Sequence, residues 1–151
     1  MSARQRYNGA KGKRDGGAFI AIPLSVLNSC AYLQASAHAR MLLFDLAVQY
    51  RGNNNGDLSA AWSQMHARGW RSKETLTKAK RELQELGLIV ETRMGARPNK
   101  ASLYALTWHA LDDCGGKLEI TAHSFQRGAY KLRDPLLMPS RKLQALERPA
   151  Y

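Results

Sequence analysis

Basic side chains are concentrated between Arg68 and Arg81, and a single acid, Glu74, lies among them. Lysine and arginine at this density suit phosphate groups, because ammonium and guanidinium groups donate charge-assisted hydrogen bonds to anions. The whole chain has 23 Lys+Arg against 12 Asp+Glu, a formal net charge of +11. A charge of this size favours a polyanionic partner, namely DNA, RNA or an anionic membrane surface. The basic residues of the cluster are Arg68, Arg71, Lys73, Lys78, Lys80 and Arg81.

A helix is predicted to carry this cluster. Ser72 is a typical N-cap and Gly87 a typical stop, so the helix should run from Ser72 to about Leu86. Its apolar residues are spaced 3, 4 and 3 apart and form one stripe that must face a core: Leu76, Ala79, Leu83 and Leu86. The opposite face then presents the polar and basic residues Lys73, Thr77, Lys78, Lys80, Arg81 and Gln84.

The first turn of this helix holds Lys73, although the helix macrodipole disfavours a cation there. The free N–H groups of a helix N-terminus suit a phosphate, and a recognition helix directs this end into the major groove of DNA. We therefore predict that residues 71–81 form a major-groove helix. For the helix taken alone, the alternative to a major-groove helix is an ordinary amphipathic helix whose basic face is solvated. The predicted contacts to phosphates and base edges are Arg71, Ser72, Lys73, Thr75, Thr77, Lys78 and Arg81.

A basic hairpin follows the helix. Strands are predicted at 88–92 and 102–108, and the turn between them contains Gly95, Pro98 and Asn99. Residues 93–100 hold three bases, Arg93, Arg97 and Lys100, and no acid. We predict that residues 93–101 form a wing that reaches a minor groove or a flanking phosphate, because arginine suits a narrow minor groove. The alternative is an ordinary solvated hairpin tip.

The order of the predicted elements indicates the fold. A strand-like run at 19–22 and a short helix starting at Pro23 are followed by a longer helix after the N-cap Ser36. A short extended piece at 58–59, a helix over 60–68 and the break at Gly69 then precede the 72–86 helix and the hairpin. This order predicts an α+β winged helix-turn-helix domain over residues 18–114, with a three-helix core and a C-terminal hairpin wing.

The two ends of the chain differ from this domain in composition. Residues 1–17 are basic and glycine-rich and contain little apolar surface, which predicts a flexible basic arm. Residues 115–151 are basic and are interrupted by prolines. They predict a tail or dimerisation segment with little structure of its own.

The run 72–89 resembles the recognition helix and following strand of winged-helix regulators of the GntR and MarR types. The shared elements are Ser-basic-x-Thr, an apolar stripe and Leu-x-x-Leu-Gly-Leu-Ile. Residues 17–108 are similar to short winged-helix proteins of bacterial phages and plasmids, through Phe-Ile-Ala-Ile-Pro, Ala-Arg-x-Leu-Leu, Tyr-x-Gly-x-Asn-Asn-Gly and Arg-Pro-Asn-Lys-Ala-Ser-x-Tyr. The resemblance implies that Lys73, Thr75 and Thr77 face DNA, although Thr77 stands where GntR-type proteins usually carry arginine. We expect no GntR-type effector domain after this stretch, because the remaining residues are too few and too polar to form one.

We expect a sequence-specific protein of double-stranded DNA that regulates transcription or takes part in replication of a mobile element. A symmetric homodimer suits a domain of this size, with the contact made by the tail or by the first helix. The alternative function is that of a protein-interaction module. Such a phage-type winged-helix module binds or inhibits a host protein or nucleoprotein complex. An RNA-binding role also stays open.

Other chemistry has weak support in the sequence. The histidines are dispersed, and the nucleophile-elbow and P-loop motifs are absent, so we expect no enzyme, no cofactor and no metal site. No run of about 18 apolar residues occurs, so we expect no membrane span. Cys30 and Cys114 are far apart, which suits a reducing cytoplasm. The resemblance to phage and plasmid proteins implies the bacterial cytoplasm or nucleoid. Trp62, Trp70 and Trp108 are predicted core anchors, and Trp70 is notable because it lies in the turn before the basic helix.

Overall fold

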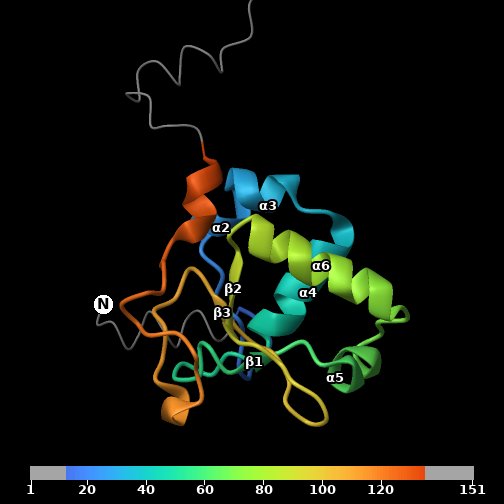
Figure 1. Cartoon of the computed structure of the whole chain (residues 1–151). Coiled ribbons are helices and arrows are strands. Elements are labelled where there is room, and N and C mark those ends of the chain that lie inside the picture. The colour runs from blue at the N-terminus through green and yellow to red at the C-terminus, as the bar shows by residue number, and fades with distance from the viewer. Residues whose placement is uncertain (1–12, 135–151) are drawn as a thin grey trace, which may run out of the picture.

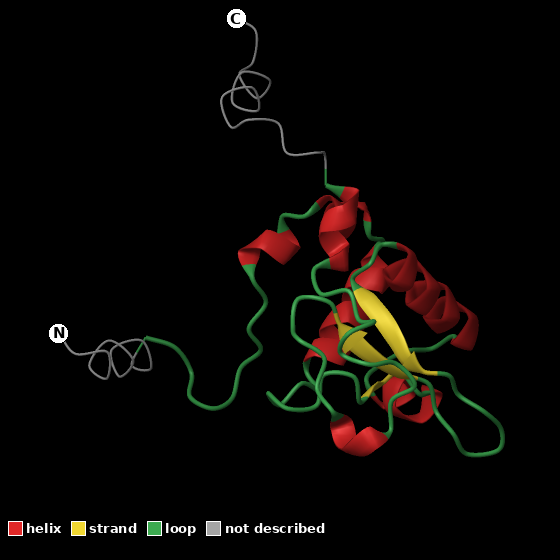
Figure 2. Cartoon of the chain, turned by 60° about the vertical axis from the view of Figure 1, so that its left-hand side comes forward, coloured by secondary structure: helices red, strands yellow, loops and turns green. Residues whose placement is uncertain are grey.

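The computed structural model describes residues 13–134, which form an α+β body (Figures 1 and 2). Residues 1–12 of the predicted arm and 135–151 of the predicted tail lie outside the described residues. No helix of the described part has the length and apolar character needed to cross a membrane. The elements are α2 (Leu24–Leu27), α3 (Cys30–Gln34), α4 (Ala37–Ala47), β1 (Leu58–Ser59), α5 (Trp62–Ala67), α6 (Lys73–Glu85), β2 (Ile89–Arg93), β3 (Leu103–Leu106) and the 3-10 helices η1 (Cys114–Gly116) and η2 (Ala129–Arg133).

Helices α4 and α6 pack against each other and form the centre of the core. Both begin at the predicted N-cap: the Ser36 hydroxyl accepts from the Ala39 N–H and the Ser72 hydroxyl from the Thr75 N–H, each at 3.2 Å. The predicted stripe of α6 is buried, as are the inner residues of α4. Burial of each such leucine contributes about 1.5–3 kcal/mol. The buried leucines of the two helices are Leu42, Leu43, Leu46, Leu76 and Leu83.

The sheet has three antiparallel strands in the order β1-β3-β2. Leu58 pairs with Tyr104 and Ile89 pairs with Leu106, so β3 lies in the middle. The strand expected at residues 19–22 is wrong, because these residues form no regular element and pair with no strand of the described sheet. β1 occupies the free side of β3, and Phe19 is left 64% exposed.

The expectation of little structure after residue 114 is wrong for residues 115–134. Tyr130 is buried in the main core, and Phe125 and Ala129 are buried beside it. The Gly128 N–H donates to the Thr107 carbonyl at 2.7 Å, and η2 packs against α3 (Figure 1). The Asp134 carboxylate accepts from the Cys30 N–H at 2.9 Å. The segment is rich in glycine and basic residues, so its composition did not indicate that a few of its apolar residues pack against the body.

Gly87 ends α6 and lies against this C-terminal segment. Its φ is +75°, and a Cβ at this position would lie 2.7 Å from the carbonyl oxygen of Ala129. Gly87→Ala should lower the free energy of unfolding by about 2–4 kcal/mol, because the strain of a left-handed residue is joined by a backbone clash. The matched control is Gly52→Ala, at a φ of +101° with nothing within 4 Å, which should cost only about 1–2 kcal/mol. Equal losses in urea denaturation would show that the approach of residues 128–130 contributes nothing.

Candidate nucleic-acid interface

The N-terminal end of α6 brings several of the predicted contact residues together. Arg71, Ser72, Lys73 and Thr77 are exposed, and Thr75 is partly exposed. The Ser72 hydroxyl caps the helix, and the Thr77 hydroxyl donates to the Lys73 carbonyl at 2.9 Å, so both groups already hold the backbone. The Lys73 ammonium lies 5.7 Å from the centre of the Trp62 ring on α5.

The acids of α6 are arranged so that part of its cationic face has no acidic partner. Glu74 pairs with Lys78 at 3.3 Å on the surface, which neutralises Lys78 locally. Glu82 points to the start of α4, where its carboxylate accepts from the Ser36 N–H at 3.1 Å and from the Ser36 hydroxyl. Among residues 13–134, Arg71, Lys73 and Arg81 form no ion pair.

Lys80 does not belong to the exposed face, and its predicted placement there is wrong. The side chain is half-buried beside Glu91 of β2. Burial lowers the pKa of its ammonium group, and the charge of Glu91 partly opposes this shift. Lys80 follows Ala79 directly and precedes Leu83 by three residues, and both of these belong to the buried stripe. Lys80 therefore lies at the edge of the stripe, on the side of the helix near the sheet. The basic face of α6 is therefore narrower than the sequence indicates.

The loop between β2 and β3, residues 94–102, is tightly closed. Ala96 and Lys100 exchange backbone hydrogen bonds of 2.8 and 2.9 Å. The Arg93 guanidinium donates to the Ala101 carbonyl through Nε at 3.2 Å and Nη2 at 2.8 Å. Arg93 thus closes the base of the β2–β3 loop, while Arg97 lies exposed near its tip. Of the three predicted bases, Arg97 alone forms no ion pair or side-chain hydrogen bond among the described residues.

Glu119 braces the β2–β3 loop from the C-terminal segment. Its carboxylate accepts from the Met94 N–H at 3.1 Å and pairs with the Lys100 ammonium at 3.3 Å. The Met94 N–H first, and then Lys100, lowers the pKa of this carboxyl group. Lys100 is consequently less available to an outside anion than Arg97. Sequence reasoning missed Glu119 because a single acid in a segment expected to lack structure has no pattern around it.

The helix and the loop lie on one side of the molecule. In both Figure 1 and Figure 2, α5, the N-terminal end of α6 and the β2–β3 loop are found at the same end of the body, away from α3 and η2. The predicted residues thus divide into a helix group and a loop group that share one side. Three of the predicted side chains already form hydrogen bonds with the backbone, namely those of Arg93, Ser72 and Thr77. Two others have an acidic partner, namely Lys78 and Lys100.

The turn between α5 and α6 is fixed to α4 by Asp45. One carboxylate oxygen accepts from the Trp70 indole N–H at 2.8 Å, and the other accepts from the Arg68 Nε at 2.6 Å. The side chain of Asp45 is only 10% exposed and that of Arg68 is 47% exposed. Trp70 is buried, as a core anchor should be. This contact sets how α5 and α6 are held relative to α4.

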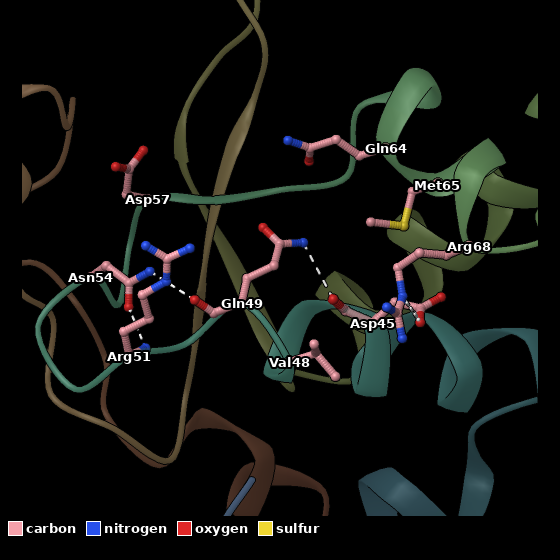
Figure 3. A pocket seen from close by; sticks show the side chains of 9 residues that line it. All are labelled: Asp45, Val48, Gln49, Arg51, Asn54, Asp57, Gln64, Met65 and Arg68. Atoms are coloured by element: carbon pink, nitrogen blue, oxygen red, sulfur yellow. Dashed lines mark hydrogen bonds and ion pairs between the residues drawn. The ribbon is translucent and has the colours of Figure 1, made fainter. Parts of the chain in front are cut away.

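A hollow of about 460 Å³ lies beside the Asp45–Arg68 pair (Figure 3). Three of its four charged side chains are engaged, since Asp45 pairs with Arg68 and Asp57 pairs with Lys117 at 3.0 Å, whereas Arg51 forms no ion pair among the described residues. The Gln49 side chain is held between α4 and β1, where it donates to the carbonyls of Asp45 and Ser59 at 3.2 and 2.8 Å. Most polar side chains that line the hollow therefore hold neighbouring parts of the fold together. Its residues are Asp45, Val48, Gln49, Arg51, Asn54, Asp57, Gln64, Met65 and Arg68.

Comparisons with protein-family models, with curated proteins and with solved structures found no match to this chain.

Proposed function

We propose that the chain is a winged helix-turn-helix protein that binds duplex DNA, with α6 in the major groove and the β2–β3 loop as the wing. The order α4, β1, α5, α6, β2, β3 and the sheet order β1-β3-β2 support this proposal. The observation that carries it is a group of exposed cations, on two neighbouring elements, that have no acidic partner among residues 13–134. These are Arg71, Lys73 and Arg81 of the helix region and Arg97 of the loop.

The proposed contacts divide by role. Arg71 and Lys73 reach phosphates or base edges from the N-terminal end of α6, where free N–H groups also favour an anion. Arg81 follows the helix toward the next phosphate, and Arg97 enters a minor groove or contacts its edge. Lys78 and Lys100 exchange their acidic partners for phosphates, which costs little because exposed ion pairs contribute about 0–1 kcal/mol. Ser72 and Arg93 position the backbone.

The proposed biological role is regulation of transcription or a part in the replication of a mobile genetic element. Affinity would come chiefly from the phosphate contacts, and sequence preference from the side chains at the start of α6. Selection of bound fragments from random duplex DNA tests this role directly, because it reports binding, sequence preference and half-site symmetry together.

Removing Arg97 should reduce the dependence of DNA affinity on salt. Arg97→Ala is expected to make the slope of log K against log salt less steep by about one unit, since one phosphate-neutralising cation is lost. The matched control is Lys131→Ala, which removes the same charge from η2 at the opposite end of the body (Figure 1). Fluorescence anisotropy with a labelled duplex over a salt series measures both slopes.

Two outcomes would contradict the proposal. One is the absence of salt-sensitive binding to duplex DNA in the full chain. The other is an equal change of slope in Arg97→Ala and Lys131→Ala, which would show that affinity follows total charge and not this face. Tighter binding to single-stranded RNA than to the duplex would favour the RNA alternative.

A further inference from the structure

The outer side of α4 carries a row of apolar residues that ends at its C-cap Val48 and is flanked by the exposed His38. Its most exposed large residues are Met41, Phe44 and Val48, which are 40%, 39% and 49% exposed. Ala37 is exposed in line with them, so the stripe runs at spacings of 4, 3 and 4 residues. Apolar residues at these spacings form the contact seam of paired helices. We call Ala37, Met41, Phe44 and Val48 the α4 stripe.

The charged residues of α4 turn away from the α4 stripe. Asp45 is buried against Trp70 and Arg68. The Arg40 guanidinium donates to the Leu33 carbonyl at 3.0 Å and lies 4.7 Å from the centre of the Tyr32 ring, toward α3. A surface helix usually presents polar residues to water, whereas α4 carries apolar residues on both its inner and outer sides. The described part of the chain covers the stripe only in part, so the three large side chains stay 39–49% exposed.

The spacing of the α4 stripe reads the same in both directions. Positions 37 and 48 lie symmetrically about the point between Leu42 and Leu43, and so do positions 41 and 44. A second α4, turned by a two-fold axis through this point, therefore places Met41 against Phe44 and Ala37 against Val48. Each pair sets a smaller residue opposite a larger one, as close packing requires. A two-fold interface must be complementary to itself, and the stripe meets this requirement.

We propose that two copies of the chain associate through the α4 stripe as an antiparallel helix pair. The proposal rests on α4 alone and does not depend on DNA binding. The contact spans about three helical turns, so it buries less than the roughly 1,600 Å² of a standard interface. The free dimer is therefore weak and forms at micromolar to millimolar concentration. Met41, Arg71 and Ser72 line a separate hollow of about 350 Å³, so pairing brings the two α6 N-terminal ends toward the symmetry axis.

Salt should strengthen this association. Each copy carries a formal net charge of +11, so the two copies repel each other at low ionic strength. Screening reduces the repulsion, while the apolar contact remains. Sedimentation equilibrium of the full chain without DNA should thus show a dimer that tightens several-fold between about 0.05 M and about 0.5 M NaCl. The salt dependence of DNA affinity has the opposite sign, which separates the two proposals.

Charge exchange tests the register of the pair. Met41→Glu and Phe44→Lys should each raise the dimer Kd by about 100-fold, because each change occurs twice across the axis. An equimolar mixture of the two variants should recover association, since Glu at position 41 of one copy then faces Lys at position 44 of the other. Leu24→Glu on α2, at a residue 74% exposed, is the control and should leave association unchanged.

Several results would overturn the proposal. One is a monomer at all concentrations up to about 1 mM, the weakest association in the proposed range. Another is undiminished association of both single variants. Failure of the mixture to associate would equally exclude the antiparallel register. Val48→Lys replaces Phe44→Lys if circular dichroism shows that the latter is unfolded, and it should weaken the dimer in the same direction.

Discussion

Asn55→Ala should lower the free energy of unfolding by about 3–5 kcal/mol, a large part of the stability of a domain of this size. The Asn55 amide is fully buried and donates to the carbonyls of Leu106 and Ala110, both at 3.0 Å. Its oxygen accepts from the Leu106 N–H at 2.8 Å. Alanine would leave these buried backbone groups without a partner and would create a cavity.

The effect should not extend to an exposed asparagine of the same loop. Asn53→Ala is the matched control because Asn53 is exposed, and it should change stability by less than about 0.5 kcal/mol. Urea denaturation followed by circular dichroism measures both variants. A loss below about 1 kcal/mol for Asn55→Ala would mean that water replaces the amide without penalty. The loop of residues 51–57 would then not be held to the end of β3 by this side chain.

Asp45→Ala should cost about 3 kcal/mol, because the buried Trp70 N–H loses its acceptor and Arg68 its partner. Asp113→Ala removes the same side chain at an exposed position and should have little effect. We expect the affinity for duplex DNA to fall with Asp45→Ala even where the protein is still folded. The turn that orients α6 is then no longer tied to α4.

A double-mutant cycle isolates the contact between Asp45 and Trp70. Trp70→Phe retains a six-membered aromatic ring and removes the pyrrole part of the indole with its N–H donor. It should therefore destabilise the wild type more than it destabilises Asp45→Ala. The coupling energy should be about 1–2 kcal/mol. Additive losses would show that the two residues stabilise the protein independently, despite their separation of 2.8 Å.

The parts of the fold that could be predicted are those with local causes. The bounds of α6 follow from Ser72, from the apolar stripe and from Gly87, all within the helix or next to it. The hairpin follows from its strand composition and its turn residues. The start of α4 follows from Ser36. For these elements, propensity and packing agree, so a short sequence window suffices.

The parts that could not be predicted depend on distant residues. Helix α3 has only five residues, and one of its first N–H groups is satisfied by Asp134. The strand expected at 19–22 has the right residue types, but β1 takes the place beside β3. At the candidate site, sequence located the cations but not their acidic partners. Glu119 and Glu91 approach Lys100 and Lys80 from elements that no local pattern connects with them.

The bond between Asp134 and the Cys30 N–H has a consequence for the order of folding. Its two residues are 104 positions apart, so α3 and η2 can dock only after nearly all of the described chain is synthesised. Closing so long a loop costs entropy before any contact offsets it, which slows this step relative to the local formation of α6. A nascent chain should therefore acquire the basic helix and hairpin first. Helix α3 leaves the ribosome before α6 and the hairpin but would complete its packing after them.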